Sequence, residues 1–434
     1  MTLSRYPLVK MLIWSLFLLL AVGFVGVAGK AEVAAVDIDD DARGYFVETH
    51  KVVTADDYVL TMYRLPKTYV ESQAGAKPAA AKPVVLLQHG LLDSSFTFVN
   101  NFVTKAWLLF WWMRGMMFGS LGRYGQHDLP AEIEYALNKT GSSTLSYVGH
   151  SEGTTQAFVG FSIDQELAEK VSYFAALAPV AWTGHLTAKI FKGMADVHLD
   201  KLFQAFAISE FSAKSTFLQE MIAGFACTVA DELCNSAVAL VAGPSVSTNT
   251  SRIPVYISQT PAGTSVKNMA HYAQNIRDNT FAAYDYGCKC KRDPGIEKCS
   301  EKKCENKKVY GSFDPPAYPI EKMVYPRTGF FIGSADTIAT ATDIERLRDA
   351  LPSGTIVHEL AVKEYSHLDL VWAYNANEKI YQDLLAQLDK YQGVGYTRIP
   401  EPIDPGSGVN SASIGSMTDD AIESRTSFSF RQLD

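Results

Sequence analysis

A pentapeptide of the form G-x-S-x-G, at residues 149–153, places Ser151 where it could act as a nucleophile. A short β-prone run precedes it at residues 145–148, and residues 154–161 can start a helix. A strand, a sharp turn and a helix in this order form a nucleophile elbow, whose glycines allow the tight turn because a Cβ would crowd it. The helix N-terminus behind the serine favours developing negative charge. The alternative is an ordinary glycine-rich turn with an incidental serine.

A serine hydroxyl is a poor nucleophile by itself, so the sequence must also supply a base and an acid that orients the base. After a nucleophile elbow, the acid comes first along the chain and the histidine second. Asp336 follows an apolar strand predicted at residues 328–333, and His367 lies in a loop after a further apolar run. Asp343 and Asp369 are rival acids, although Asp369 is too near His367 in sequence to reach it comfortably. This order predicts a triad of serine, histidine and Asp336.

Hydrolysis through such a triad also requires an oxyanion hole, which two backbone N–H groups can form. One donor should be the residue after the nucleophile, Glu152. The other should follow an earlier strand, and Leu91 follows an apolar run at residues 84–88. We predict Leu91 and Glu152 as the two donors, with an ordinary buried leucine after a turn as the alternative for Leu91. This chemistry needs no metal or organic cofactor.

The chain resembles the acid lipase family, which comprises the gastric and lysosomal acid lipases and their relatives in other eukaryotes. The matching segments follow the family's order between residues 44 and 388: VTADDYVL at 53–60, LQHGLLDSS at 87–95, DLPA at 128–131, YVGHSEGT at 147–154, ALAPV at 176–180, PAGTSV at 261–266 with Asn268 and Met269, and SHLD at 366–369. The resemblance implies an α/β-hydrolase fold, with a mostly parallel central sheet and a helical cap inserted after the sixth strand. It also implies hydrolysis of acylglycerols or sterol esters.

The same resemblance assigns functional roles residue by residue. Ser151 is the nucleophile, His367 the base and Asp336 the acid, with Leu91 and Glu152 as oxyanion donors. The family usually has Gln where this chain has Glu152. A charged carboxylate beside the oxyanion would oppose its formation, unless the side chain points away or is protonated. We therefore expect Glu152→Gln to leave activity similar or to raise it at neutral pH.

The composition is that of a globular protein, with 47% hydrophobic and 20% charged residues in a chain of 434. The formal net charge of −8 argues against a nucleic-acid partner, which would need a basic patch. Arg5 and Lys10 precede an uncharged apolar run at residues 11–28, and small residues follow, which indicates a signal peptide at residues 1–29. An uncleaved membrane anchor is the alternative. Both interpretations predict an exported protein, secreted or lysosomal.

Export changes how the six cysteines are interpreted, because an oxidising compartment favours disulfides. Cys288, Cys290, Cys299 and Cys304 share one lysine-rich segment, while two more lie in a helical-looking stretch at residues 227–234. We expect disulfides, with a pairing that the sequence leaves open. A zinc site is the alternative, although the spacing fits no common site well. Two triplets match the pattern of N-glycosylation acceptors, at residues 138–140 and 249–251.

The chain divides into segments by composition and by the resemblance. We expect a signal peptide at 1–29, the first part of the α/β-hydrolase core at 30–181, a helical cap or lid with a cysteine-rich insert at 182–310, the second part of the core at 311–392 and a disordered tail at 393–434. Helical stretches with one apolar face at 201–211 and 220–241 suit a lid, because a lipase must cover hydrophobic surface when it is away from fat. The expected partner is a lipid ester at a lipid–water interface. Alternatively, these faces simply pack on the core.

One stretch, AWLLFWWMRGMMFG at residues 106–119, does not fit this pattern. The family has a central strand and a following turn in this region, and neither is recognisable here. We read the codons of residues 105–119 in the frame that begins at the third base of each codon. In that frame, five pairs of neighbouring codons can encode only Leu, Val, Asp, Asp and Val, in this order. These five residues agree with the family's strand apart from one Ala-to-Val difference. We hypothesise that residues around 105–122 are an out-of-frame translation, so that the chain lacks a central strand and folds poorly. An interface-binding loop and a buried strand are the alternatives.

The sequence therefore predicts a secreted serine lipase that acts through a Ser-His-Asp triad and an acyl-enzyme. The nearest alternative is a carboxylesterase for smaller esters on the same scaffold. The alternative without enzymatic function is a catalytically inactive homologue or the product of a defective gene.

Overall fold

The computed structural model describes residues 45–79, 82–100, 116–119, 124–196, 210–211, 242–248, 252–257, 260–288 and 304–396. The described residues up to Gly395 belong to one compact unit. The predicted signal peptide lies outside the described residues, as do the helical stretch expected at 220–241 and nearly all of the expected tail. Within the described part of the chain, no helix is long and apolar enough to cross a bilayer.

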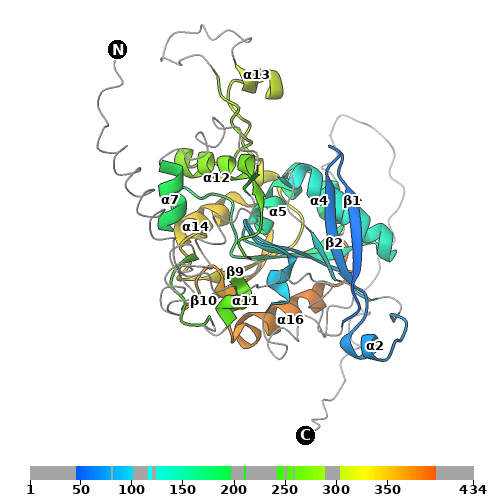
Figure 1. The fold of residues 1–434 in the computed structure, drawn as a ribbon. Coiled ribbons are helices and arrows are strands. Elements are labelled where there is room, and N and C mark those ends of the chain that lie inside the picture. The colour runs from blue at the N-terminus through cyan, green and yellow to red at the C-terminus, as the bar shows by residue number, and fades with distance from the viewer. Residues whose placement is uncertain are drawn as a thin grey trace, which may run out of the picture. The chain divides into compact units, whose positions relative to one another are not determined.

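A sheet of eight strands, counted over the described residues, runs in the order β1-β2-β4-β3-β5-β6-β9-β10 (Figure 1). The pairs β1–β2 and β2–β4 are antiparallel, and every pairing from β4 to β10 is parallel. The strands are β1 (Glu48–Val53), β2 (Val59–Leu65), β3 (Val85–Gln88), β4 (Met116–Gly119), β5 (Leu145–His150), β6 (Val171–Leu177), β9 (Thr328–Gly333) and β10 (Ile356–Val362). The α/β-hydrolase fold with a mostly parallel central sheet is thus confirmed.

Helices connect the strands of the core, as expected for parallel pairs, which need crossover connections. Between β4 and β6 lie α4 and α5, which pack along each other. The helices of the core are α2 (Tyr69–Gln73), α4 (Tyr124–Thr140), α5 (Glu152–Ile163), α6 (Gln165–Glu169), α14 (Ala341–Ala350), α15 (Asp369–Trp372) and α16 (Gln382–Tyr391), with shorter helical turns η1 (Ser95–Phe98), η5 (Ile320–Lys322) and η6 (Asn377–Tyr381).

The central strands are rich in apolar residues because both faces of the sheet are covered. Every residue of β3, β5, β6 and β9 is buried. On β6, Phe174 packs edge-on against Phe158 and Phe161 of α5, whereas its neighbour Tyr173 stacks on Tyr391 of α16. Since successive side chains of a strand point to opposite faces, α5 and α16 cover opposite faces of the sheet (Figure 1).

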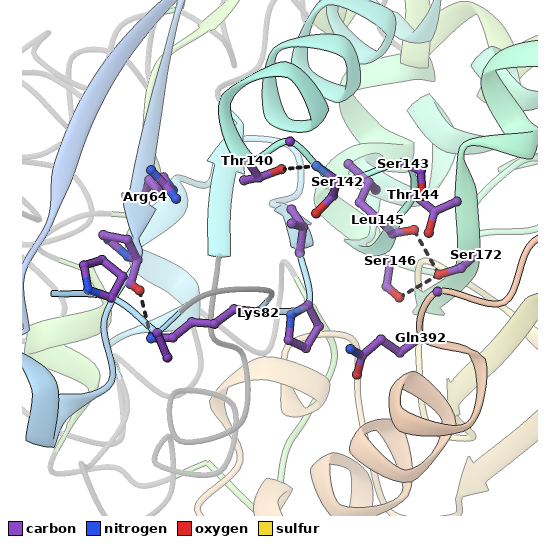
Figure 2. A pocket seen from close by; sticks show the side chains of 17 residues that line it. Arg64, Lys82, Thr140, Ser142, Ser143, Thr144, Leu145, Ser146, Ser172 and Gln392 are labelled. Atoms are coloured by element: carbon purple, nitrogen blue, oxygen red, sulfur yellow. Dashed lines mark hydrogen bonds between the residues drawn. The ribbon is translucent and has the colours of Figure 1, made fainter.

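A polar cavity of about 590 Å³ lies where β3, β5 and β6 begin (Figure 2). Serine and threonine residues of the turn at 140–146 line it, and Ser172 Oγ donates to the carbonyl oxygen of Leu145 at 3.1 Å. Lys82, which also lines it, donates to the carbonyl oxygen of Pro66 and pairs with Glu71. The cavity therefore lies at the amino ends of the parallel strands, the edge of the sheet opposite to Ser151.

The segment expected as a cap lies between β6 and β9, in agreement with an insertion after the sixth strand. Its described elements are α7 (Lys189–Asp196), β7 (Glu210–Phe211), α11 (Ile253–Ile257), β8 (Thr264–Ser265), α12 (Val266–Asp278) and α13 (Glu305–Tyr310). The expected helix at 201–211 is wrong at its end, because Glu210 and Phe211 pair with β8 as a short antiparallel strand. The limits of the cap stay a prediction.

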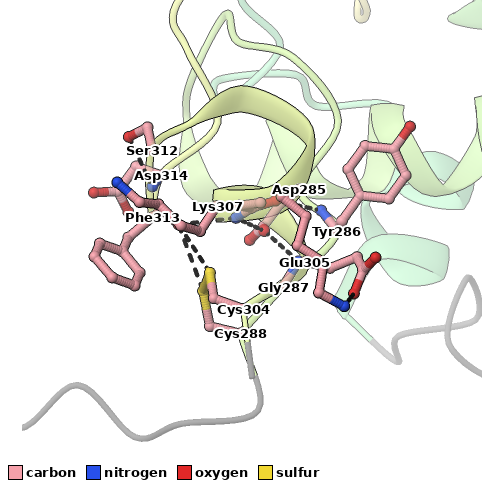
Figure 3. The surroundings of a disulfide bond; sticks show 12 residues. Asp285, Tyr286, Gly287, Cys288, Cys304, Glu305, Lys307, Ser312, Phe313 and Asp314 are labelled. Atoms are coloured by element: carbon pink, nitrogen blue, oxygen red, sulfur yellow. Dashed lines mark hydrogen bonds and ion pairs between the residues drawn. A yellow bond between two sulfur atoms is a disulfide. The ribbon is translucent and has the colours of Figure 1, made fainter. Parts of the chain in front are cut away.

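The cysteine-rich insert is closed at its base by a disulfide between Cys288 and Cys304 (Figure 3). The two cysteines also face each other in an isolated antiparallel bridge. Next to them the buried amide of Asn306 donates to Asp285 Oδ1 at 2.7 Å and to the carbonyl oxygen of Phe313 at 3.0 Å. The structure thus suggests one pair, and the pairing of the cysteines stays a prediction, since the remaining four lie outside the described residues.

The strand β4 contradicts the expectation that the chain lacks a central strand. Met116–Gly119 pairs in parallel with β3 and antiparallel with β2, so it fills the position between them. A short run of large apolar residues can occupy a sheet position that is enclosed by two neighbours, whatever frame encoded it. Of the stretch at 106–119, residues 106–115 lie outside the described part. The out-of-frame hypothesis stays a prediction, which sequencing of the coding DNA tests.

Candidate active site

Ser151 lies at the turn between β5 and α5, at the carboxyl edge of the sheet. Its backbone has φ 54° and ψ −117°, a strained conformation for a residue that carries a side chain. A Cβ on Gly149 would lie 2.7 Å from the carbonyl carbon of Gly153, and a Cβ on Gly153 would lie 2.4 Å from the carbonyl oxygen of Gln88. Only glycine fits at either position, and α5 therefore starts directly against the end of β3.

The three residues predicted to form the triad meet at this edge of the sheet. His367 Nε2 lies 2.7 Å from Ser151 Oγ, and His367 Nδ1 lies 2.8 Å from Asp336 Oδ2. All three side chains are buried. When Nδ1 donates its hydrogen to the carboxylate, Nε2 is left as the acceptor for the serine proton. The geometry thus allows a proton to pass from the serine to the histidine.

The carboxylate of Asp336 is held from behind by the backbone. Its Oδ1 accepts hydrogen bonds from the N–H groups of Ile338 at 2.7 Å and Ala339 at 3.0 Å. These two donors fix the orientation of the carboxylate, with Oδ2 toward His367. Asp336 is therefore suited to orient the imidazole and to stabilise its positive charge.

Neither rival acid contacts the ring of His367. Asp343 accepts hydrogen bonds from the backbone N–H of His185 at 3.0 Å and from its Nδ1 at 2.7 Å. Asp369 accepts from the backbone N–H and hydroxyl of Ser366 at 2.7 and 2.9 Å, and from Thr248 at 3.2 Å. Both carboxylates are committed to local structure, which leaves Asp336 as the acid that reaches the histidine.

The two expected oxyanion donors belong to segments that meet Ser151. The N–H of Glu152 is the first of α5 and so has no acceptor within that helix. On the other side, a Cβ placed on Gly90 would lie 2.9 Å from the Cβ of Ser151, so the loop that carries Leu91 passes close to the nucleophile. Leu92 has a positive φ of 59°, which turns this loop sharply. The donor roles of Leu91 and Glu152 stay predictions.

The side chain of Glu152 is buried, with 2% of its surface exposed. Its Oε1 accepts a hydrogen bond from Asn268 Nδ2 at 2.8 Å, while Oε2 has no partner among the described residues. Burial raises the pKa of this carboxyl to about 8; the hydrogen bond from Asn268 lowers it, and the charge of Asp128 raises it further. The carboxyl is therefore neutral at pH 7, so it carries no negative charge that would oppose a nearby oxyanion.

Comparison with known proteins identifies the family of this chain. Residues 41–102 match the family described as a partial alpha/beta-hydrolase lipase region. The chain is 31% identical to human gastric triacylglycerol lipase over 376 residues, which cover 80% of this chain and 89% of that protein. It is 32% identical to human lysosomal acid lipase/cholesteryl ester hydrolase, with the same coverage of both chains. The chain belongs to the acid lipase family. A further relative, lipase lipl-1 of Caenorhabditis elegans, is 32% identical over 79% of this chain and 88% of its own.

In this acid lipase family member, a second histidine supports the loop of His367. His150 Nε2 lies 3.1 Å from the carbonyl oxygen of His367, to which it donates, and the two rings are 5.2 Å apart. Burial, with a smaller contribution from His367, lowers the pKa of His150 to about 3. His150 is therefore neutral and does not repel a protonated His367. The sequence placed it beside the serine, but nothing in the sequence pairs it with a residue so far along the chain.

Asp93 is another residue to which the sequence assigned no role. Its Oδ1 accepts a hydrogen bond from Thr260 Oγ1 at 2.9 Å, and Ala262 N donates to the carbonyl oxygen of Leu92 at 2.6 Å. Burial raises the pKa of Asp93 to about 6, although its hydrogen bonds and the charge of His367 lower the pKa. Through these contacts the cap segment holds the loop on the Leu91 side of the nucleophile. Leu92, Asp93 and Ala262 lie within segments that resemble the family, and Thr260 directly precedes one of them.

Proposed function

We propose that this chain is a secreted serine lipase that hydrolyses carboxylic esters of acylglycerols or sterol esters through a Ser-His-Asp triad. The observation that carries the proposal is the continuous hydrogen-bonded series from Ser151 Oγ through His367 to Asp336, in a member of the acid lipase family. The names of the gastric and lysosomal relatives give the substrate class. The chain's own residues supply the chemistry.

In the acylation step, His367 Nε2 takes the proton of Ser151 as Oγ bonds to the ester carbonyl carbon. The carbonyl π electrons move to the oxygen, which the N–H groups of Leu91 and Glu152 stabilise. Asp336 stabilises the imidazolium that forms. When the tetrahedral intermediate collapses, the bond to the alkoxy group breaks, and that group leaves as the alcohol with the proton from Nε2. The acyl group remains on Ser151.

Deacylation repeats the same steps with water. His367 takes a proton from the water as its oxygen bonds to the acyl carbon, and the oxyanion again forms between the two backbone donors. Collapse releases the carboxylic acid and returns the proton to Ser151 Oγ. No charge accumulates beyond the imidazolium and the oxyanion.

Labelling with a fluorophosphonate tests the nucleophile directly. We expect the probe to modify Ser151 in folded protein, as located by mass spectrometry, and to leave Ser151→Ala unlabelled. Ser162 is a matched control, because it is a buried serine of α5 that donates to the carbonyl oxygen of Val159. A folded chain that is not modified at Ser151 would contradict the proposal and favour the inactive homologue.

The substrate range separates a lipase from a carboxylesterase for smaller esters. We propose the lipase, because the relatives are lipases and a cap segment contacts both loops beside Ser151. The expected result is faster hydrolysis of emulsified long-chain esters than of soluble short-chain esters, with a jump in rate as substrate passes its solubility limit. Equal or faster turnover of soluble esters, without such a jump, would support the carboxylesterase.

The exported location is part of the same proposal. It is supported by the signal-like sequence at residues 1–29 and by the names of the gastric and lysosomal relatives. Expression of the full chain in a eukaryotic cell should release active enzyme into the medium or deliver it to the lysosome. N-terminal sequencing of the mature chain should find cleavage near Gly29 or Ala31. Retention of an intact N-terminus in the membrane fraction would favour the uncleaved anchor.

A further inference from the structure

The side chain of Asn268 joins the cap segment to the nucleophile elbow. Asn268 lies in the first turn of α12, where its backbone N–H donates to the N-cap residue Ser265 at 3.0 Å. Its Nδ2 donates to Glu152 Oε1 at 2.8 Å and to Thr264 Oγ1 at 3.1 Å. The amide is buried, with 3% of the residue exposed. It is thus fixed from the cap side and reaches the residue whose N–H faces the oxyanion.

The same cap segment is anchored at other points around the site. Thr260 bonds to Asp93 on the Leu91 side, and Tyr272 donates its hydroxyl hydrogen to Thr155 Oγ1 of α5 at 3.2 Å. The contact through Asn268 differs from these because it ends on the oxyanion-donor residue itself. A shift of α12 would therefore be transmitted to the N–H of Glu152.

The groups around the Glu152 carboxyl determine whether it bonds to Asn268 in its neutral or its charged form. Asp128 of α4 is acidic, Asn268 of α12 is neutral, and Tyr272 of α12 is a phenol whose pKa this carboxyl helps to raise. None of them is basic. Since Oε2 has no partner among the described residues, ionisation would bury a charge that only one amide hydrogen bond compensates. The burial that raises the carboxyl's pKa to about 8 is consistent with this geometry.

We propose that Asn268 is a positioning residue for ester hydrolysis, which holds the neutral side chain of Glu152 and thereby keeps the Glu152 N–H aimed at the oxyanion until that carboxyl ionises. The inference rests on the serine-lipase function proposed above. Once the carboxyl loses its proton, a negative charge belonging to the donor residue itself opposes the oxyanion. The pair therefore sets the alkaline limit of activity.

The pH profile of kcat tests the role of the carboxyl. Wild type should lose at least about tenfold in kcat as pH rises from 7 to well above the carboxyl's pKa of about 8, because two like charges repel strongly at this range in a protein interior. Glu152→Gln keeps the shape of the side chain and its acceptor oxygen but has no proton to lose, so the ratio of its kcat values at the two ends of this pH range should not show the tenfold decline. Glu166→Gln, on an exposed residue of α6, is the matched control and should follow wild type.

The variant Asn268→Ala tests the positioning role. We expect kcat to fall about tenfold at neutral pH with KM changed less than twofold, since one hydrogen bond to the donor residue is lost. Because the amide donor lowers the carboxyl's pKa, its removal should also move the alkaline limit to higher pH. A purely structural role would lower the melting temperature without moving this limit. If Asn268→Ala does not fold, the isosteric Glu152→Gln series decides the proposal.

The outcomes separate this inference from the proposed function. Wild type that neither hydrolyses esters nor reacts with fluorophosphonate would show that both proposals are wrong. Active wild type in which Glu152→Gln keeps the same alkaline decline would overturn the role of Asn268 and Glu152 alone, and the lipase proposal would stand. A lost decline in Glu152→Gln, together with a shifted limit in Asn268→Ala, supports the inference.

Discussion

The two sides of Ser151 use the same kind of group, a buried carboxyl, in opposite ways. On the acid–base side, Asp336 accepts two backbone hydrogen bonds on one oxygen and the imidazole of His367 on the other. On the oxyanion side, Glu152 accepts one amide hydrogen bond and leaves its second oxygen without a partner among the described residues. The first carboxyl thus has three hydrogen-bond donors, whereas the second has one donor, and its burial favours the neutral form. The difference teaches that the donors and the burial that the fold supplies, and not residue type alone, separate the two carboxyls.

The largest effect on kcat should follow from removing the hydroxyl of Ser151, on which both sides act. Ser151→Ala should lower kcat by about 10⁴–10⁶, because the nucleophile is lost while the oxyanion donors remain. The measurement is single-ester turnover by purified protein, with Ser162→Ala as a control that should stay close to wild type. A loss below tenfold in Ser151→Ala would mean that neither side of this serine performs the reaction.

Breaking only the acid–base side should cost less. Asp336→Asn should lower kcat by about 10³–10⁴, since the amide no longer stabilises the imidazolium or fixes the tautomer that leaves Nε2 free. Asp343→Asn is the matched control, because Asp343 bonds to His185 and not to His367. If Asp343→Asn proved the more damaging of the two in kcat, the assignment of the acid would be wrong.

His150 offers a smaller disturbance of the same side. His150→Leu removes the donor to the carbonyl oxygen of His367 and should lower kcat about tenfold with KM nearly unchanged. His150→Gln retains a donor and should recover most of the loss. Equal kcat losses in both variants, or a change confined to KM, would contradict a role in holding the loop of His367.

Much of the acid–base side could be predicted from the sequence, because its signals are local. The strand at 328–333 has the bounds that the apolar run predicts, and Asp336 follows it. The tight glycine turn around Ser151 is likewise encoded in five consecutive residues, and the fold class is the one that the resemblance to the acid lipase family implies. Where one short segment determines the geometry, residue types and their order are enough.

The oxyanion side could be predicted only in part, because its contacts join distant segments. Asn268 and Glu152 are 116 residues apart, and Thr260 and Asp93 are 167 apart. The sequence marked Glu152 as unusual, yet its charge state depends on burial that only the fold creates. The error over β4 has a related cause, since a four-residue strand gains its place from the two strands beside it.

The smallest effect that we predict is on the pH dependence of folding stability. It tests the protonation of Glu152 without a measurement of ester hydrolysis. In the folded chain the pKa of Glu152 is about 8, well above the value near 4.3 of an exposed glutamate. Between these pH values the folded state binds more protons than the unfolded state, so this group stabilises the fold at acid pH and the stabilisation is lost as pH rises toward 8.

Thermal melting from pH 5 to 8 should therefore show wild type losing stability relative to Glu152→Gln as pH rises, by a few kcal/mol at most. Parallel curves for wild type and Glu152→Gln would mean that the Glu152 carboxyl is charged in the folded chain, and the contrast between the two sides of Ser151 would disappear.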